Sequence, residues 1–457
     1  MSSQKINMCE GSIFKKQAAF FIPILFTYLL QQFFNVADVM LASTLSFSGN
    51  DAVAAVGSTT AITRLLINFF VGSSTGTAIV VSQAIGSKNE KSIQKSVHTS
   101  VLLSFIFGGF LTITGIAVSK PILIAIGTPR NILSLSVIYL RTYFLGMIPY
   151  TVYNFSAAIL RAAGETKKPL YYLLISGPVK LILTVFFVKT LNLDVAGLAL
   201  ATTCSQFVSA FFCLITLFKR KDECRIIFKE LKIHKKPLKN ILLLGVPSGI
   251  QSSLFSLSGV IIQSSVNSLS YISGFITGNA AATSIESFTD AITTAFYQTI
   301  ITFTAQNAGA KNYSRIKNGC ISCCAFSTIF IAIVSVMVCL IPKTIIGLYI
   351  HNDPSAVYWG VIKLFFLFIP LIFQGLMDVI AGTLRGLSVS VPTTIITLLG
   401  ICGTRILWIY TIFATDKFHT PQVLYLCYPI SWAITFIAEL VLLKIAYKNF
   451  KKRYSVT

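Results

Sequence analysis

The sequence contains few charged residues. Asp, Glu, Lys and Arg make up only 11% of the 457 residues, whereas 54% are hydrophobic and the mean hydropathy is +0.77. A soluble globular protein needs more polar surface than this, so the composition argues against that class. We expect the chain to lie in a lipid bilayer.

Motifs of common enzymes are also missing. The chain contains no HExxH and no P-loop, which argues against a zinc hydrolase and against ATP-driven transport. Asp290 and Asp378 invite comparison with an aspartyl protease pair, but neither follows a Gly-x-Gly sequence. We therefore expect no enzyme activity, and an intramembrane enzyme is a minor alternative.

Long apolar runs follow one another along the whole sequence. A helix needs about 20 apolar residues to cross ~30 Å of hydrocarbon, and in lipid only a helix or a closed barrel pairs every backbone group. Twelve runs reach this length, at approximately 17–44, 52–84, 96–118, 132–160, 170–190, 195–218, 240–268, 279–308, 319–341, 355–383, 392–413 and 422–446. The sequence predicts an all-α membrane protein with twelve transmembrane helices.

The net charge of +22 would suggest a nucleic-acid partner in a soluble protein, but here the positions of the charges indicate membrane topology. Most basic residues fall at the termini and in the even-numbered connections, which the positive-inside rule places in the cytoplasm. The opposite loops contain only Lys120, Arg130, Lys189, Lys343 and Lys417. Both termini are therefore expected inside, no nucleic acid is expected to bind, and the first span is expected to be retained.

The chain contains an internal repeat. Residues 82–89 (SQAIGSKN) are echoed by residues 305–312 (AQNAGAKN) at an offset of 223, and Leu160-Arg161 is echoed by Leu384-Arg385 at 224. This predicts two pseudo-symmetric six-helix bundles, at 1–218 and 240–457, in parallel orientation. The basic linker at 219–239 either attracts anionic cytoplasmic lipid or simply sets topology, and we favour the second reading.

Polar residues in the first span lie on one helix face. Gln31, Gln32, Asn35 and Asp38 follow the spacing of that face, and polar groups inside a membrane are costly unless they line a cavity or have partners. These four residues are therefore predicted to line a cavity. Asp38 is predicted to couple transport to an ion, or alternatively to be the structural partner of a buried base.

Further candidates lie in other spans. Arg64 and Lys180 should face the interior of the first bundle, because lipid offers a base neither water nor a carboxylate. Gln251 belongs to a span rich in small polar residues, which suit helix packing or a cavity equally well. Glu286 and Asp290, one turn apart, fit either a proton or cation site or an ion pair with Lys363 or Arg405.

Several stretches together resemble the multidrug and toxic compound extrusion (MATE) family. The resemblance covers nearly the whole chain and rests on residues 35–38 (NVAD), 49–57 (GNDAVAAVG), 82–86 (SQAIG), 160–169 (LRAAGETKKP) and 384–386 (LRG). It implies a V-shaped central cavity and export of organic cations in exchange for protons or sodium, with Asp38 at the family's coupling position. Lys180 departs from the family pattern, where an Asn is expected.

The resemblance also implies partners and location. We expect a small-molecule substrate, a proton or sodium as the coupling ion, no cofactor, and a functional monomer in the cell membrane; the sequence defines no metal site. The intramembrane bases Arg64, Arg141 and Lys180 would also suit a flippase or exporter of an anionic or lipid-linked substrate. Such flippases usually have two further helices, so antiport is the leading hypothesis.

Overall fold

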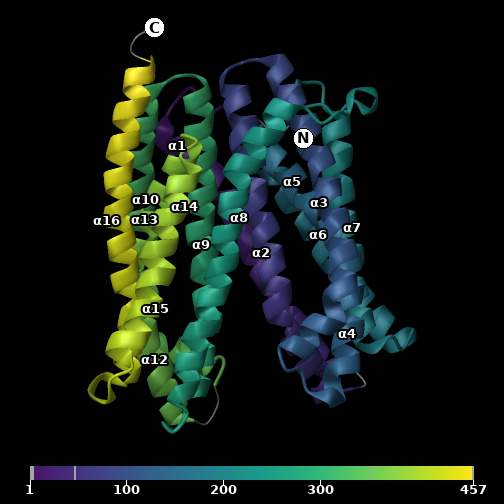
Figure 1. The fold of residues 1–457 in the computed structure, drawn as a ribbon, viewed down its shortest axis with the longest axis vertical. Helices are drawn as coiled ribbons and strands as arrows, with labels where there is room; N and C mark the ends of the chain where they lie inside the picture. Colours follow the sequence, from purple (N-terminus) through teal and green to yellow (C-terminus); the bar gives the residue numbers. More distant parts are fainter. Residues whose placement is uncertain (1–4, 46–47, 351–352, 455–457) are drawn as a thin grey trace. The chain divides into compact units, whose positions relative to one another are not determined.

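The computed structural model describes residues 5–45, 48–350 and 353–454, and within these ranges the chain is helical, with no strand (Figure 1). Contacts between residues divide it into two compact units. The first comprises Met1–Asn7 and Ile22–Ile250, and the second Met8–Phe21 and Gln251–Thr457. The unit limits thus fall inside the first helix of each repeat, and the domain limits expected from the sequence stay a prediction.

The helices of the two sequence repeats follow one plan. The first repeat contains α1 (Ile13–Leu45), α2 (Asn50–Gly86), α3 (Glu90–Ala125), α4 (Arg130–Leu145), α5 (Met147–Ala162), α6 (Lys167–Val185), η1 (Phe186–Thr190) and α7 (Asp194–Lys219), followed by η2 (Phe228–Glu230) in the linker. The second repeat contains α8 (Lys235–Ser268), α9 (Phe275–Gly309), α10 (Tyr313–Leu340), α11 (Pro342–Gly347), α12 (Pro354–Phe368), α13 (Leu371–Gly386), α14 (Ser390–Thr397), η3 (Leu398–Gly403), α15 (Thr404–Trp408), η4 (Ile409–Phe413), η5 (Asp416–Phe418) and α16 (Pro421–Tyr454).

The repeated motif at residues 82–89 and 305–312 forms the same turn twice. Lys88 and Lys311 both have a positive φ, 54° and 58°, which ends the helices α2 and α9. The next residues, Asn89 and Asn312, then accept a hydrogen bond from the backbone N–H three positions later and so cap α3 and α10. Both copies of the repeated sequence therefore end one helix and begin the next with the same backbone geometry.

Two of the expected spans are bent pairs of helices. The expected span 132–160 corresponds to α4 and α5, which meet at 44° around Gly146, and 355–383 corresponds to α12 and α13, which meet at 42° beside Pro370. Proline cannot donate a backbone hydrogen bond and disrupts a continuing helix. At Gly146 an added Cβ would lie 2.7 Å from Oγ1 of Thr203 in α7. The backbone at the bend therefore lies close to α7.

The described helices match the length that a membrane requires. Nine are long and apolar enough to cross a bilayer, and the two bent pairs bring the number to eleven. The remaining expected span corresponds to α9, which is 35 residues long and carries Glu286 and Asp290. It is not among the nine, and its two acids belong to the site described below.

Helices α2 and α8 touch backbone to backbone within the first unit. Each carries a G-x-x-x-G sequence, Gly72 and Gly76 in α2 and Gly245 and Gly249 in α8. A Cβ on Gly76 would lie 2.3 Å from the carbonyl oxygen of Ile241, and one on Gly245 would lie 2.3 Å from that of Ser73. Only glycine permits such an approach, which is a common way to pack helices in lipid.

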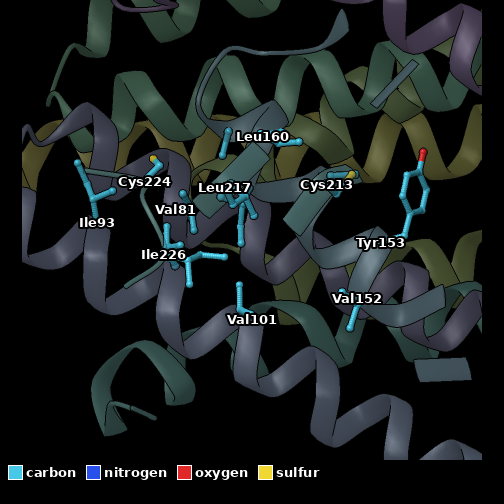
Figure 2. Packing of buried hydrophobic residues seen from close by; sticks show 14 of the residues in the cluster. Val81, Ile93, Val101, Val152, Tyr153, Leu160, Cys213, Leu217, Cys224 and Ile226 are labelled. Carbon is cyan, nitrogen blue, oxygen red and sulfur yellow. The ribbon is translucent and has the colours of Figure 1, made fainter. Parts of the chain in front are cut away.

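The core of the first unit includes part of the linker. Val81, Val101, Val152 and Leu160 pack with other buried side chains from α2, α3, α5 and α7 (Figure 2). Cys224 and Ile226 of the linker belong to the same cluster, together with Ile93, Cys213 and Leu217. The linker is therefore anchored by buried apolar side chains.

Candidate functional site

The predicted polar face of α1 is helical throughout. Gln31 and Gln32 are half-buried, and Asn35 is exposed and donates from Nδ2 to Gln32 Oε1 at 3.4 Å. Asp38 belongs to the same helix, but its side chain lies outside the described residues. The predicted role of this face in lining a cavity stays a prediction.

Lys180 lies on α6 close to α1. Its side chain is buried, and Gly177, one turn before it, lies under the ring of Phe34: a Cβ on Gly177 would be 1.8 Å from that ring. α1 and α6 are the first and fifth spans, and odd-numbered spans run in the same direction. Lys180 lies one turn after Gly177, and Asp38 lies one turn after Phe34, so both follow this contact on the same side. Arg64 on α2 is exposed.

The second unit contains an ion pair between α9 and α12. Lys363 Nζ lies 3.4 Å from Glu286 Oε2, and the same ammonium donates a hydrogen bond to Thr283 Oγ1. It also lies 5.9 Å from the ring centroid of Tyr425. Of the two readings of Glu286, an ion pair with Lys363 is the one found in the structure.

Asp290 has a different partner from Glu286. Its Oδ1 accepts a hydrogen bond from Gln374 Nε2 of α13 at 3.4 Å, and this is a neutral amide. Asp290 is also within electrostatic range of Glu286 and Arg405. Asp378 on α13 is half-buried and interacts electrostatically with Asp290 and with Arg385. Asp290 therefore lacks the direct compensation that Lys363 gives Glu286.

Arg385 joins three further elements of the second unit. Its side chain is buried at 2% exposure and donates from Nη1 to Tyr297 Oη at 2.6 Å and from Nη2 to Gln251 Oε1 and Thr394 Oγ1. The guanidinium thus links α13 with α8, α9 and α14. Gln251, predicted as a site residue, is placed by this contact in the polar network.

Two more charged residues complete the network. Glu439 of α16 is fully buried, and its Oε1 accepts a hydrogen bond from Thr397 Oγ1 at 2.7 Å. Arg405 of α15 donates to Ser431 Oγ at 3.1 Å and lies 4.5 Å from the ring centroid of Tyr428. The charged groups in this network of the second unit are the acids Glu286, Asp290, Asp378 and Glu439 and the bases Lys363, Arg385 and Arg405.

The network exceeds what the sequence alone had indicated. Glu286, Asp290 and Gln251 were predicted, and the structure adds Arg385, which the sequence marked only as a repeated residue, and Tyr297 and Thr394 as its partners. The pattern of a basic residue followed by glycine at the end of an apolar helix could have identified Arg385 as a candidate site residue from the sequence. Within the described ranges no group of three or more His, Cys, Asp or Glu residues is arranged to hold a metal ion.

Long apolar helices with acids and bases paired among them are typical of a multi-pass membrane transport protein. The sequence model of the MatE family matches the chain twice, at residues 23–187 and at 247–411, with an offset of 224. The chain belongs to the MatE family. The double match confirms the internal duplication and the family resemblance.

Known relatives agree with this assignment. The chain is 26% identical over 404 residues to the probable multidrug resistance protein YoeA of Bacillus subtilis (strain 168), an alignment that covers 87% of this chain and 86% of that protein. An outward-facing structure of a multidrug resistance MATE family transporter of the MOP superfamily shares the fold with a TM-score of 0.87 and 20% identity, covering 99% of this chain and all of that one.

A second solved structure shares the fold. It is a MOP superfamily transporter from Pyrococcus furiosus Vc1 (DSM3638), for which reverse polarity of the binding pocket suggests a different function. It has a TM-score of 0.86 and 20% identity to this chain, with 99% of both chains covered. The predicted fold class, twelve membrane helices in two pseudo-symmetric bundles, is confirmed, and the chain is a transporter and not an enzyme.

Proposed function

We propose that this protein is a secondary active antiporter that exports organic, cationic drugs or metabolites in exchange for protons or sodium by alternating access. The proposal rests mainly on the acidic side chains that the membrane-crossing helices of this MatE family member carry. In the second unit Glu286 is compensated by Lys363, whereas Asp290 has an amide partner. Asp290 is exposed, and an acid without a basic partner in a membrane-crossing helix favours binding a proton or a cation.

The count of charges in the second unit supports a monovalent coupling ion. Four acids and three bases form its network, so one negative charge is left over when all groups ionise. One proton or one sodium ion neutralises that excess. We propose that Asp290 and its neighbour Asp378 share this charge, and that Gln251 and Glu286 contribute to the polar lining of the cavity.

In the first unit, we propose that Asp38 is the coupling residue. Lys180 lies on the neighbouring helix at the level expected for an electrostatic partner, and a base that moves towards or away from a carboxylate changes its proton affinity. Gln31, Gln32 and Asn35 would supply hydrogen bonds to the substrate on the same face, and Arg64 would contribute positive charge. The alternative is that Asp38 only neutralises a base and stabilises the bundle.

Transport by the purified full-length protein in proteoliposomes tests the proposal. A cationic fluorescent dye such as ethidium is loaded, and a pH gradient and a sodium gradient are imposed separately. We expect one gradient to accelerate dye movement several-fold over vesicles with no gradient. Equal rates with and without both gradients would refute ion-coupled antiport.

The coupling role of Asp38 is tested with Asp38→Asn, measured beside the amount of protein in the membrane. The proposed role requires normal expression with gradient-driven transport abolished. Normal gradient-driven transport in this variant would show that Asp38 is not the coupling residue. Asp290→Asn, tested in the same vesicles, shows whether the second unit contributes to the coupling.

A second candidate is an exporter of an anionic or lipid-linked substrate. Lys180 and Arg385 are both buried, and the Pyrococcus furiosus relative has been linked to a pocket of reverse polarity. Buried bases favour a negatively charged substrate. The vesicle assay separates the candidates: gradient-driven transport of an anionic dye, without transport of ethidium, would favour the second.

We also propose that the protein lies in the cell membrane with both termini in the cytoplasm and functions as a monomer, with no cofactor. The asymmetric distribution of Lys and Arg supports this orientation. Single cysteines in a cysteine-free background test it. Lys236→Cys should be shielded from an impermeant reagent added outside intact cells, and Asp416→Cys should react.

A further inference from the structure

We propose that the first unit contains a binding site for a phosphate group, formed by the beginning of α3 and by the linker before α8. The site is separate from the membrane-embedded polar network. It lies at the end of the helices that carries the linker, which we propose to be the cytoplasmic end. Its ligand would be the phosphate of an anionic lipid headgroup or of a soluble phosphorylated compound.

The site is a cavity of about 270 Å³. Two segments far apart in the sequence line it: Lys91, Gln94, Lys95 and His98 from α3, and Lys229, Glu230, Lys232 and His234 from the linker. Four lysines therefore surround the cavity, with one glutamate. In the described part of the chain, none of these four lysines has an acid within ion-pair distance.

The cavity is held in shape by contacts that do not involve the lysines. The backbone N–H of Ile227 donates to His98 Nε2 at 3.2 Å, and the N–H of His234 donates to Thr99 Oγ1 at 3.1 Å. These bonds fasten the linker to α3 on both sides of Lys229 and Lys232. The buried side chains of Ile93 in α3 and Ile226 in the linker belong to one hydrophobic cluster (Figure 2).

The start of the linker is fastened independently. Arg220 is buried and pairs with Glu165 at 3.0 Å and with Asp222 at 2.6 Å. The rings of Phe218 and Phe228 stack with centroids 4.4 Å apart, just before Lys229. The lysines thus project from a fixed backbone, so little ordering of the backbone is needed when a ligand binds.

The arrangement of charge points to an anion. His98 accepts a hydrogen bond at Nε2 and is therefore neutral, so four lysines against Glu230 leave the cavity strongly positive. Ammonium groups bind phosphate oxygens as point charges, and several around one cavity suit a doubly charged group.

A neighbouring groove favours a lipid as the source of the phosphate. Lys235, Leu238, Lys239, Leu242 and Leu243 at the start of α8 line an open groove that follows His234 directly in the chain. Lys235, Leu238 and Leu242 share one face of the helix. Leucines beside lysines at the end of a membrane-crossing helix provide apolar contact for an acyl chain next to a cationic headgroup site.

The experiment uses the purified full-length protein in detergent and two probes. Native mass spectrometry measures binding of dioleoylphosphatidylglycerol against dioleoylphosphatidylcholine, and titration calorimetry measures binding of glycerol 3-phosphate. The site variants are Lys229→Gln/Lys232→Gln and Lys91→Gln/Lys95→Gln. The matched control is Lys221→Gln/Lys236→Gln, which removes two exposed linker lysines that do not line the cavity.

We expect each site variant to bind the phosphate probe roughly 25-fold more weakly than the wild type, since each basic residue near a membrane surface is worth about fivefold. The control should bind within about twofold of the wild type, and all variants should keep the wild-type elution profile and unfolding midpoint. Loss of phosphatidylglycerol binding alone identifies a lipid, and loss of glycerol 3-phosphate binding identifies a soluble ligand. Binding of neither probe, or equal losses in site and control variants, would overturn the site.

Discussion

Lys363 Nζ lies 3.4 Å from Glu286 Oε2, and their side chains are only 3% and 21% exposed. The pair connects α12 with α9 across 77 residues of sequence. Since lipid offers neither charge a counterion, the two groups depend on each other. The hydrogen bond to Thr283 and the nearby ring of Tyr425 complete the surroundings of the ammonium.

The first prediction is that Lys363→Met destabilises the protein much more than the double variant Lys363→Met/Glu286→Gln. Removing one partner of a buried pair leaves an uncompensated charge, which costs about 3–5 kcal/mol, whereas removing both charges costs far less. Unfolding midpoints of the purified variants measure this in a double-mutant cycle. Additive effects of the two single substitutions would show that the pair contributes no coupling energy.

The second prediction concerns Arg385. Arg385→Lys should lower stability and transport even though it keeps the charge, because one ammonium does not reproduce the fork that reaches Tyr297, Gln251 and Thr394. Tyr297→Phe removes one of these bonds and should cost about 1.5–3 kcal/mol, the range for a hydrogen bond to a charged group. In the Arg385→Lys background, Tyr297→Phe should have a smaller effect. An undiminished effect would mean that Tyr297 acts independently of Arg385.

The third prediction tests the close approach of α2 and α8. Gly76→Ala places a methyl group 2.3 Å from the backbone oxygen of Ile241, so the helices must separate, at a cost of about 1–3 kcal/mol. Gly109→Ala in α3 is the matched control, because nothing lies within 4 Å of its Cβ position. It should be neutral or stabilising by up to about 1 kcal/mol, since alanine favours a helix. Equal effects of both substitutions on the unfolding midpoint would contradict the contact.

The fourth prediction is a pH dependence at the start of the linker. Burial disfavours ionisation of Asp222, but hydrogen bonds from Arg220 and Lys5 outweigh it and hold the pKa of that carboxyl well below its usual range. A lowered pKa in the folded state stabilises the protein above pH ~4, the unfolded value, and this contribution is lost as the pH falls further. The Lys5 side chain is more than half exposed, so Arg220 provides most of the effect.

Asp222→Asn should therefore destabilise the protein at pH 7 by roughly 1.5–3 kcal/mol, the value of a hydrogen bond to a charged group. The difference from the wild type should shrink as the pH is lowered from 5 to 3. Glu223→Gln is the control, since Glu223 has no ion pair in the part of the chain that the structure describes. A constant difference between Asp222→Asn and the wild type across this range would exclude the proposed linkage.

The sequence alone was sufficient to predict the membrane location, the helical class and the duplication. Each rests on properties that single residues carry along the chain: long apolar runs, sparse charge, and motifs repeated at a constant offset. The repeated turn at Lys88 and Lys311 follows equally from local chemistry, since Asn89 and Asn312 cap helices within four residues.

The bends near Gly146 and Pro370, the contact of α2 with α8, and the partners of the charged residues were decided by the tertiary structure. The sequence left Glu286 with Lys363 or Arg405 as alternatives and did not mark Arg385 as a site residue. An ion pair or a hydrogen bond depends on distances of a few ångströms between helices that are far apart in the chain. Helix packing sets those distances, and residue type and spacing along one helix do not.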